Sequence, residues 1–342
     1  MKTIALLIDD PAVGGVGRTL DNQIEQLAAE FRIRRMLVDT RHPLPPMLDD
    51  DAVIVHFSSS WAKLPFLTLA RAQRSGRPIV LVEHMYSESF ERVRVPNIMR
   101  FRAMLRLAYR LVDTVVCVSE GQARWMQAAG LVPAAKIRVI RSASDCQHLF
   151  EIAPPQYAGD RPLRLAAYGR YSLQKGYDVL IEAMRLVPPA VATLTFAGYG
   201  EDEAAMKLAA ASLPHVRVGQ SVGDLAAFLA QCDAVVVPSR WEPFGLVAAE
   251  ARSAARPLIV SDLDGLSEQV KRDTGLAVAP ENPRLLADAI IRLRGRDLGA
   301  MGLAARASVV DHFQEHLRGY RELYASLPAR DVVGEPALSP VM

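Results

Sequence analysis

The sequence has few cysteines, no long apolar run and almost no net charge. Its 342 residues include only Cys117, Cys146 and Cys232, which are scattered without the spacing of a metal site. Isolated thiols in an odd number argue against a disulfide framework and fit a reducing compartment. No run approaches the ~20 apolar residues of a membrane span, and the first apolar run ends at Asp9, too early for a signal peptide. We therefore expect a cytoplasmic protein, with the inner face of the cell membrane as a further place where it could act.

The charge balance excludes further classes of protein. Lysine and arginine number 40 and aspartate and glutamate 38, which leaves a net charge of +2. Such a balance does not favour general binding of nucleic acid. No short-period repeat appears, so a solenoid is not expected. Half of the residues are apolar, and a chain of this length suits two domains with separate cores.

Short β-branched runs alternate with helical segments along the chain. Strand-like runs lie at residues 3–8, 36–38, 52–55, 78–82 and 114–118, and then at 163–168, 192–197, 216–218, 235–237 and 258–260. Helical segments lie at 18–31, 65–73, 98–111, 283–292, 298–312 and 315–327. This alternation predicts an α/β fold of βαβ units with helices on both faces of a parallel sheet. The Pro-rich stretch 153–162 separates two Rossmann-like domains, predicted at 1–152 and 163–315.

The segment from residue 235 to Glu250 is suited to a negatively charged ligand. A buried strand ends there, and an Ala/Leu/Glu-rich helix follows, with Pro243 near its first turn. The first N–H groups of a helix lack partners, and Gly245 lets a ligand approach the backbone. Glu242 and Glu250 are eight residues apart, roughly 12 Å along a helix, about the distance from a hexose to the ribose of a nucleotide-sugar. A capped surface helix with two solvated glutamates is the structural alternative.

The amino-acid sequence of this segment also resembles that of a known protein family. PSRWEPFGLVAAEA followed by RPLIVSDLDGL resembles the signature of retaining glycosyltransferases of family 4, which have the GT-B fold. The resemblance implies two domains facing across a cleft, with a C-terminal helix over 316–330 returning to the N-terminal domain before a loose tail at 331–342. It also implies transfer of a hexose-type sugar from a UDP- or GDP-sugar to the hydroxyl of a saccharide or lipid-linked acceptor, in polysaccharide, lipopolysaccharide or glycolipid synthesis. No metal and no cofactor beside the nucleotide-sugar are expected.

The resemblance assigns roles to individual residues. Gly169-Arg170 and Lys175-Gly176 match a family element, so Arg170 and Lys175 would stabilise the leaving diphosphate. Glu242 would hold the sugar hydroxyls and Glu250 the ribose, because carboxylates accept hydrogen bonds from hydroxyls. Phe244, Gly245 and Leu246 would offer backbone N–H groups. His84 would lie near the sugar and acceptor, and Gln220 would lie in the loop that borders the base. His56 is a second candidate for the acceptor site.

The glycine loop at residues 14–17 is open to several interpretations. In a dinucleotide site it would start a G-x-G-x-x-G motif with Asp39 as the ribose-binding acid, although Leu20 replaces the third glycine. In a P-loop, Arg18 would replace the lysine, which is not a conservative change for a phosphate clamp. The family resemblance instead places Gly15 and Gly17 in the cleft, opposite the donor phosphates. A tight turn without a ligand is the structural alternative.

The segment 98–111 is a basic amphipathic helix by its periodicity. Apolar residues fall on one side, namely Ile98, Phe101, Met104, Leu105, Ala108 and Leu111, and Arg102, Arg106 and Arg110 fall on the other. Such a helix could touch an anionic membrane. A helix packed on the core with a solvated arginine face is equally compatible with the pattern.

Three further functions fit parts of the sequence. A GT-B-like sugar-nucleotide epimerase would interconvert donors without an acceptor. A non-catalytic nucleotide-sugar-binding subunit would bind the donor without turnover. An NAD-dependent oxidoreductase would use the glycine loop. Asp262 and Asp264 form the one Asp-x-Asp pair at a strand end, and we expect them to shape their loop and not to bind a metal.

Overall fold

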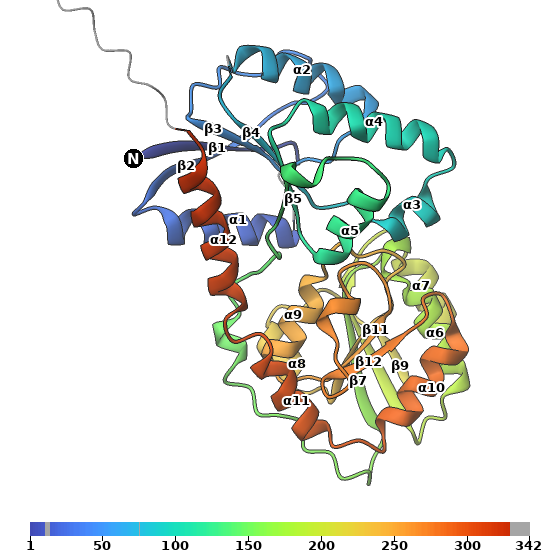
Figure 1. Ribbon diagram of the computed structural model, residues 1–342. Coiled ribbons are helices and arrows are strands. Elements are labelled where there is room, and N and C mark those ends of the chain that lie inside the picture. Colours follow the sequence, from blue (N-terminus) through green and yellow to red (C-terminus); the bar gives the residue numbers. More distant parts are fainter. Residues whose placement is uncertain (11–13, 75, 329–342) are drawn as a thin grey trace, which may run out of the picture.

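The computed structural model describes residues 1–10, 14–74 and 76–328, which form two α/β domains (Figure 1). The sheet of the first domain is parallel throughout, with the order β2-β1-β3-β4-β5-β6. Its strands are β1 Lys2–Ile8, β2 Phe31–Leu37, β3 Ala52–Val55, β4 Ile79–Glu83, β5 Thr114–Cys117 and β6 Ile137–Val139. The helices of this domain are α1 Gly14–Leu27, α2 Leu64–Gln73, α3 Glu88–Arg94, α4 Ile98–Arg110 and α5 Glu120–Ala128.

The second domain repeats the plan, with the parallel order β12-β11-β10-β7-β8-β9. Its strands are β7 Leu163–Arg170, β8 Ala192–Tyr199, β9 Val216–Val218, β10 Ala234–Val237, β11 Leu258–Ser261 and β12 Gly275–Val278. Its helices are α6 Tyr177–Leu186, α7 Glu203–Ala210, α8 Leu225–Ala230, α9 Leu246–Ser253, α10 Pro283–Leu293 and α11 Leu298–Ala307, and α12 His312–Ser326 follows. Both sheets are all-parallel and carry helices on both faces, as the alternation predicts.

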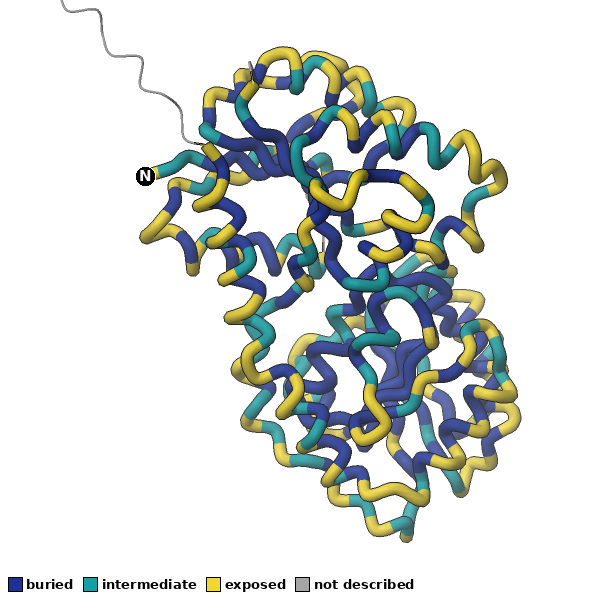
Figure 2. Tube along the Cα trace, viewed as in Figure 1, coloured by how far each residue is buried: buried dark blue, intermediate teal, exposed yellow. Residues whose placement is uncertain are grey.

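The core of each domain is built from the strands, which form the most deeply buried segments in Figure 2. In the first sheet, alternate residues belong to separate clusters on the two faces, for example Leu7 and Val55 on one face and Leu6 and Ile54 on the other. This alternation follows from the two-residue period of a strand. Because both faces are covered, the strands read as continuous apolar runs in the sequence.

Some predicted boundaries are wrong. The first helix begins at Gly14 and ends at Leu27, and Phe31 opens the second strand, which the sequence placed at 36–38. Beside the helix predicted at 98–111, α3 forms separately. The strands β6 and β12, three and four residues long, were not predicted.

Helix α12 crosses back to the first domain and lies beside α1 in Figure 1. Leu317, Tyr320 and Leu323 join the cluster under the first sheet. The Lys2 ammonium donates to backbone carbonyls at the end of the helix, including that of Tyr324, where a cation also complements the helix dipole. The C-terminal helix, predicted at 316–330, begins earlier, at His312, and ends at Ser326. Residues 329 and 330 and the predicted tail at 331–342 lie outside the described residues.

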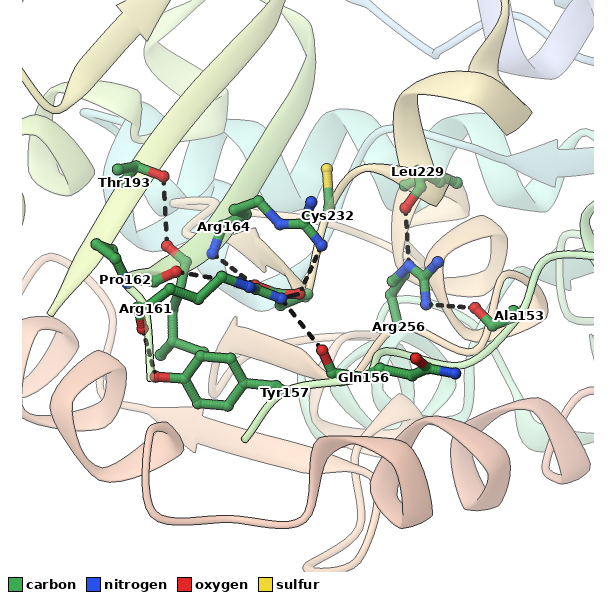
Figure 3. Close-up of polar contacts among 12 residues, drawn as sticks. Ala153, Gln156, Tyr157, Arg161, Pro162, Arg164, Thr193, Leu229, Cys232 and Arg256 are labelled. Atoms are coloured by element: carbon green, nitrogen blue, oxygen red, sulfur yellow. Dashed lines mark hydrogen bonds and ion pairs between the residues drawn. The ribbon is translucent and has the colours of Figure 1, made fainter. Parts of the chain in front are cut away.

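The stretch between the domains is fixed to the second one. The Arg161 guanidinium donates two hydrogen bonds to the Asp233 carboxylate, at 2.6 and 2.9 Å, and the Arg164 backbone N–H adds a third at 2.8 Å. Arg256 donates to the carbonyls of Ala153 and Leu229 (Figure 3). Burial alone would raise the pKa of Asp233, but the hydrogen bonds from Arg161 and Arg164 outweigh it, so the pKa lies below its usual value. The linker is thus held by charge-assisted bonds.

Candidate functional site: a cavity between the two domains

A cavity of about 600 Å³ lies between the domains, at the carboxyl ends of their strands. Open α/β sheets bind ligands at this edge. Nine of the eleven positions that the sequence singles out line it, namely Gly15, His84, Arg170, Lys175, Glu242, Phe244, Gly245, Leu246 and Glu250. Gly17 and Gln220 do not line it. Gly17 lies within α1 between the lining residues Val16 and Arg18. At the base loop, Ser221 and Val222 contribute to the wall where Gln220 was expected.

The N-terminus of α9 opens onto this cavity, and Gly245 makes that geometry possible. Gly245 caps the helix with φ of +98°, a left-handed conformation that side chains disfavour. A Cβ at this position would lie 2.6 Å from the Leu266 side chain and 3.2 Å from the Glu242 side chain. Gly245 has no side chain that could cap the helix, so the first backbone N–H groups remain available to an anion.

Glu242 and Lys175 form an ion pair at the cavity wall. The Lys175 ammonium donates to Glu242 Oε2 at 2.5 Å, and the Ser239 hydroxyl bonds the same oxygen at 3.2 Å. The turn that carries Lys175 lies against the end of β10, because Gly176 approaches the Pro238 carbonyl so closely that a Cβ would lie 2.2 Å from its oxygen. A cation and a carboxylate are therefore placed side by side in this wall.

Arg170 differs from Lys175 in being exposed and unpaired within the described part of the chain. It ends β7, next to Gly169, and lines the same cavity. A planar guanidinium without a carboxylate partner is suited to bidentate contact with phosphate oxygens. Arg170, Lys175 and the α9 N-terminus thus place positive electrostatic potential around one space.

Glu250 lies at the far end of the site and is bonded from both domains. Arg18 on α1 donates to Glu250 Oε1 at 3.0 Å, and the Tyr168 hydroxyl donates to Oε2 at 3.1 Å. Burial raises the pKa of Glu250, although the Arg18 guanidinium opposes this shift. Arg18 is therefore paired with a carboxylate, whereas the lysine of a P-loop contacts phosphate oxygens. Asp39, the acid required by the dinucleotide interpretation, pairs with Arg41 and does not line the cavity.

His84 and His56 lie side by side where the neighbouring strands β4 and β3 end. His84 Nε2 and His56 Nδ1 are 3.0 Å apart, and the two rings stack. His84 lines the cavity, whereas His56 is buried and does not. The assignment of His56 to the acceptor site stays a prediction, with the residue placed behind His84 and not in the cavity wall.

Two carboxylates to which the sequence assigned no contact between the domains join them beside the cavity. Asp264 accepts bonds from the Ser87 hydroxyl at 2.7 Å and the Ser89 backbone N–H at 3.1 Å, both at the start of α3, and from the Glu242 backbone N–H at 3.1 Å. Glu268 accepts from the Gly121 backbone N–H at 2.8 Å, at the start of α5. Carboxylates at helix N-termini complement the helix dipole. Asp264 has φ of +43°, and the following glycine in SDLDG is the only local sign of this turn.

The described residues hold no cluster of three or more histidine, cysteine, aspartate or glutamate side chains that could bind a metal ion. Asp262 accepts a bond from the Ser267 hydroxyl at 2.7 Å, so the two aspartates of the Asp-x-Asp pair bond different parts of the structure.

The predicted basic face of α4 is only partly solvated. Arg102 forms two hydrogen bonds to Glu91, and Arg106 donates to the carbonyls of Ala129 and Gly130. Ile98, predicted to face the core, is 44% exposed. In the part of the chain that the structure describes, no helix is long and apolar enough to cross a membrane. The helical periodicity therefore predicted the solvated and buried sides of α4 only in part.

The two all-parallel domains and the cavity between them define a GT-B protein. A family model described as glycosyl transferases group 1 matches residues 162–295, and one described as glycosyltransferase family 4 matches residues 31–148. Each model matches less than half of the chain, and together they make both domains similar to glycosyltransferases.

Individual relatives agree with the assignment. A glycogen synthase of Mycobacterium tuberculosis is 36% identical over 165 residues, which are 46% of this chain and 39% of that protein, so the chain spans about two fifths of the relative's length. The Anabaena protein Alr3699/HepE, solved in complex with UDP and glucose, superposes with a TM-score of 0.72 at 18% identity, over 96% of this chain and all of that chain. Sucrose-phosphate synthase from Thermosynechococcus elongatus gives a TM-score of 0.74 at 20% identity, over 95% of this chain and all of that one.

Proposed function

We propose that this protein transfers a hexose-type sugar from a UDP- or GDP-sugar to an acceptor hydroxyl, with retention at the anomeric carbon and without a metal ion. The observation that carries the proposal is the convergence of Arg170, Lys175, Glu242 and Glu250 with the N-terminus of α9 on one interdomain cavity. The two matching glycosyltransferase family models support sugar transfer, and the UDP and glucose in the solved Anabaena protein support the donor class.

The chemistry assigned to each residue follows from its charge and place. Arg170 and Lys175 stabilise the negative charge that grows on the diphosphate as it leaves. The backbone N–H groups at Gly245 and Leu246 contribute to the same phosphate site. Glu242 accepts bonds from the sugar hydroxyls, and Glu250 accepts them from the ribose. Two cations and a helix N-terminus then take the place that a divalent metal fills in other transferases.

The proposed step breaks the bond between the anomeric carbon and the diphosphate oxygen and forms a bond to the acceptor oxygen on the same face. The acceptor's proton passes to the departing phosphate oxygen, so no carboxylate nucleophile is required. The acceptor is a saccharide or a lipid-linked sugar, and the product belongs to a polysaccharide, lipopolysaccharide or glycolipid. A glycogen synthase among the relatives supports the polysaccharide class.

Calorimetric titration against UDP, GDP, ADP and NAD, with a chelator present, tests the donor site. Saturable binding of UDP or GDP alone supports the proposal and names the base. Binding of NAD or ADP, with neither UDP nor GDP, rejects it in favour of the oxidoreductase or ATPase interpretation of the glycine loop. Conversion of one nucleotide-sugar into another without an acceptor would identify an epimerase, and donor binding without turnover across an acceptor panel would identify a binding subunit.

A further inference from the structure

The contact between His56 and His84 determines how His84 can act on a substrate. Both side chains follow the ends of adjacent parallel strands, which brings the rings together with His84 Nε2 and His56 Nδ1 3.0 Å apart. Burial lowers the pKa of both imidazoles, that of His84 to about 4, so both rings are neutral at pH 7. A neutral imidazole carries one N–H and one bare nitrogen, and a single proton therefore lies between these two nitrogens.

Two arrangements of that proton are possible. If His84 Nε2 carries it, His56 must hold its own proton on Nε2, and His84 Nδ1 is bare. If His56 Nδ1 carries it, His56 Nε2 is bare, and His84 holds its proton on Nδ1. His56 Nε2 is buried and has no hydrogen-bond partner among the described residues. Orphaned buried N–H donors are rarer in proteins than under-satisfied acceptors, so the second arrangement is favoured.

Two other buried histidines of this chain follow the same rule. His316 Nδ1 donates to the Arg141 carbonyl at 2.7 Å, and His215 Nε2 donates to the Met184 carbonyl at 3.1 Å. A carbonyl only accepts, so the proton lies on the bonded nitrogen in both. The other ring nitrogen is then bare, and in each case it is buried without a partner. In these two residues, therefore, the N–H group is bonded and the unpartnered nitrogen is the bare one.

We propose that His56 is a positioning residue that fixes His84 as the Nδ1–H tautomer, so that His84 serves the site as a hydrogen-bond donor and not as a base. His84 lines the cavity, and its Nδ1 has no partner among the described residues. Its Nε2 lone pair is occupied by His56, so neither nitrogen can take the proton of an acceptor hydroxyl. The partner of Nδ1–H is an oxygen of the transferred sugar or of the diphosphate, and this part of the inference rests on the proposed transferase function.

The tautomer is measured directly by nitrogen-15 NMR of histidine-labelled protein, because protonated and bare ring nitrogens resonate far apart. The chain has seven histidines, and the spectra of His56→Asn and His84→Asn assign the two pairs of signals. We expect protonated Nδ1 and bare Nε2 for both residues in the wild type. A protonated Nε2 on His84 overturns the proposal. This readout needs neither ligand nor turnover, so it stands or fails independently of the transferase function.

Variants at position 56 separate positioning from packing. His56→Leu fills the space without a polar group, and we expect the His84 proton to distribute onto Nε2 and kcat/KM to fall about tenfold, the value of one hydrogen bond of about 1.4 kcal/mol. His56→Asn places an amide where Nδ1 lies, and we expect it to recover most of the loss. An unchanged His84 tautomer in His56→Leu would show a structural role only. Circular dichroism and thermal unfolding identify any variant that does not fold.

Variants at position 84 test the donor itself. Asn can place an amide N–H near the position of Nδ1, whereas the longer Gln matches Nε2. We therefore expect His84→Asn to retain more transfer than His84→Gln. The reverse order would contradict donation from Nδ1, whether or not both variants still bind the nucleotide.

Discussion

Asp264 joins the two domains, and its removal should weaken the fold measurably. Its carboxylate accepts the bonds from Ser87, Ser89 and Glu242 at 2.7 to 3.1 Å. Hydrogen bonds to a charged group contribute about 1.5–3 kcal/mol each, so three bonds give roughly 5 kcal/mol before compensation. Burial raises the pKa of Asp264, which shows that its charge carries a desolvation cost that the substitution relieves. We expect removal of the carboxylate to lower the free energy of unfolding by about 3 kcal/mol.

The choice of substitution follows from the backbone. Because φ at Asp264 is +43°, alanine would add strain of about 1–2 kcal/mol, whereas glycine and asparagine tolerate this region. Asp264→Gly removes the acceptor without that strain. Asp264→Asn keeps one acceptor oxygen, so its free energy of unfolding should fall by only about 1 kcal/mol.

Urea unfolding measures these differences in free energy. Small-angle scattering measures the radius of gyration, which we expect to rise in Asp264→Gly. The increase follows because the start of α3 is no longer bonded to the second domain. Asp262→Asn is the matched control, because Asp262 lies in the same loop and its carboxylate bonds only Ser267, a residue of its own domain, among the described residues. We expect that control to lie within about 0.5 kcal/mol of wild type. A similarly small effect for Asp264→Gly would refute the reasoning.

Three further predictions concern the donor site and the linker. Lys175→Ala and Glu250→Ala should each weaken binding of the nucleotide diphosphate about tenfold by calorimetry, and unchanged affinity in both would reject the site. Glu242→Ala should lose more affinity for the nucleotide-sugar than for the bare diphosphate, whereas equal losses would remove its assignment to the sugar. The pKa of Asp233 is lowered in the folded state, so its stabilisation is present above the unfolded pKa of about 4 and is lost as the pH falls through the folded pKa. The deficit of Asp233→Asn in unfolding free energy should therefore shrink below about pH 4, and a pH-independent deficit would contradict the ion pair.

The local part of the site was predictable because one segment encodes it. Strand β10, its Pro238 stop, the left-handed Gly245 and helix α9 follow one another within 20 residues, so their order fixes where Glu242 and Glu250 point. Arg170 and His84 were also predictable, because Arg170 ends β7 and His84 follows β4, and the carboxyl ends of both strands face the cleft. Position in a βαβ unit is enough to place such residues near the ligand edge.

Strands β6 and β12, which the sequence missed, and β2, which it placed at 36–38, are all edge strands of their sheets. The remaining edge strand, β9, was predicted, so an edge position hinders prediction without preventing it. An edge strand buries fewer side chains, and β2 exposes Arg32, Arg34 and Arg35. Its apolar run is therefore interrupted, and the pattern that identifies a central strand is absent. The helix before it was consequently extended to Phe31, which in fact opens the strand.

Contacts across the cleft could not be predicted, because they join residues far apart in the chain. Asp264 meets Ser87 and Ser89 over more than 170 positions, and Arg18 meets Glu250 over 232. No local pattern specifies which helix N-terminus faces a given loop. Only the docking of the two domains brings these groups together.

The two carboxylates assigned to the donor are each paired with a cation in the structure, Glu242 with Lys175 and Glu250 with Arg18. The Arg18 side chain is 61% exposed and that of Glu250 only 4%, so the arginine can leave more easily than the carboxylate. On the proposed function, donor binding is therefore an exchange of partners: hydroxyl groups of the ribose and sugar replace the cations on the carboxylates, and the released Lys175 turns to the diphosphate. Such an exchange leaves neither carboxylate without hydrogen-bond donors at either stage, which limits the cost of burying its charge.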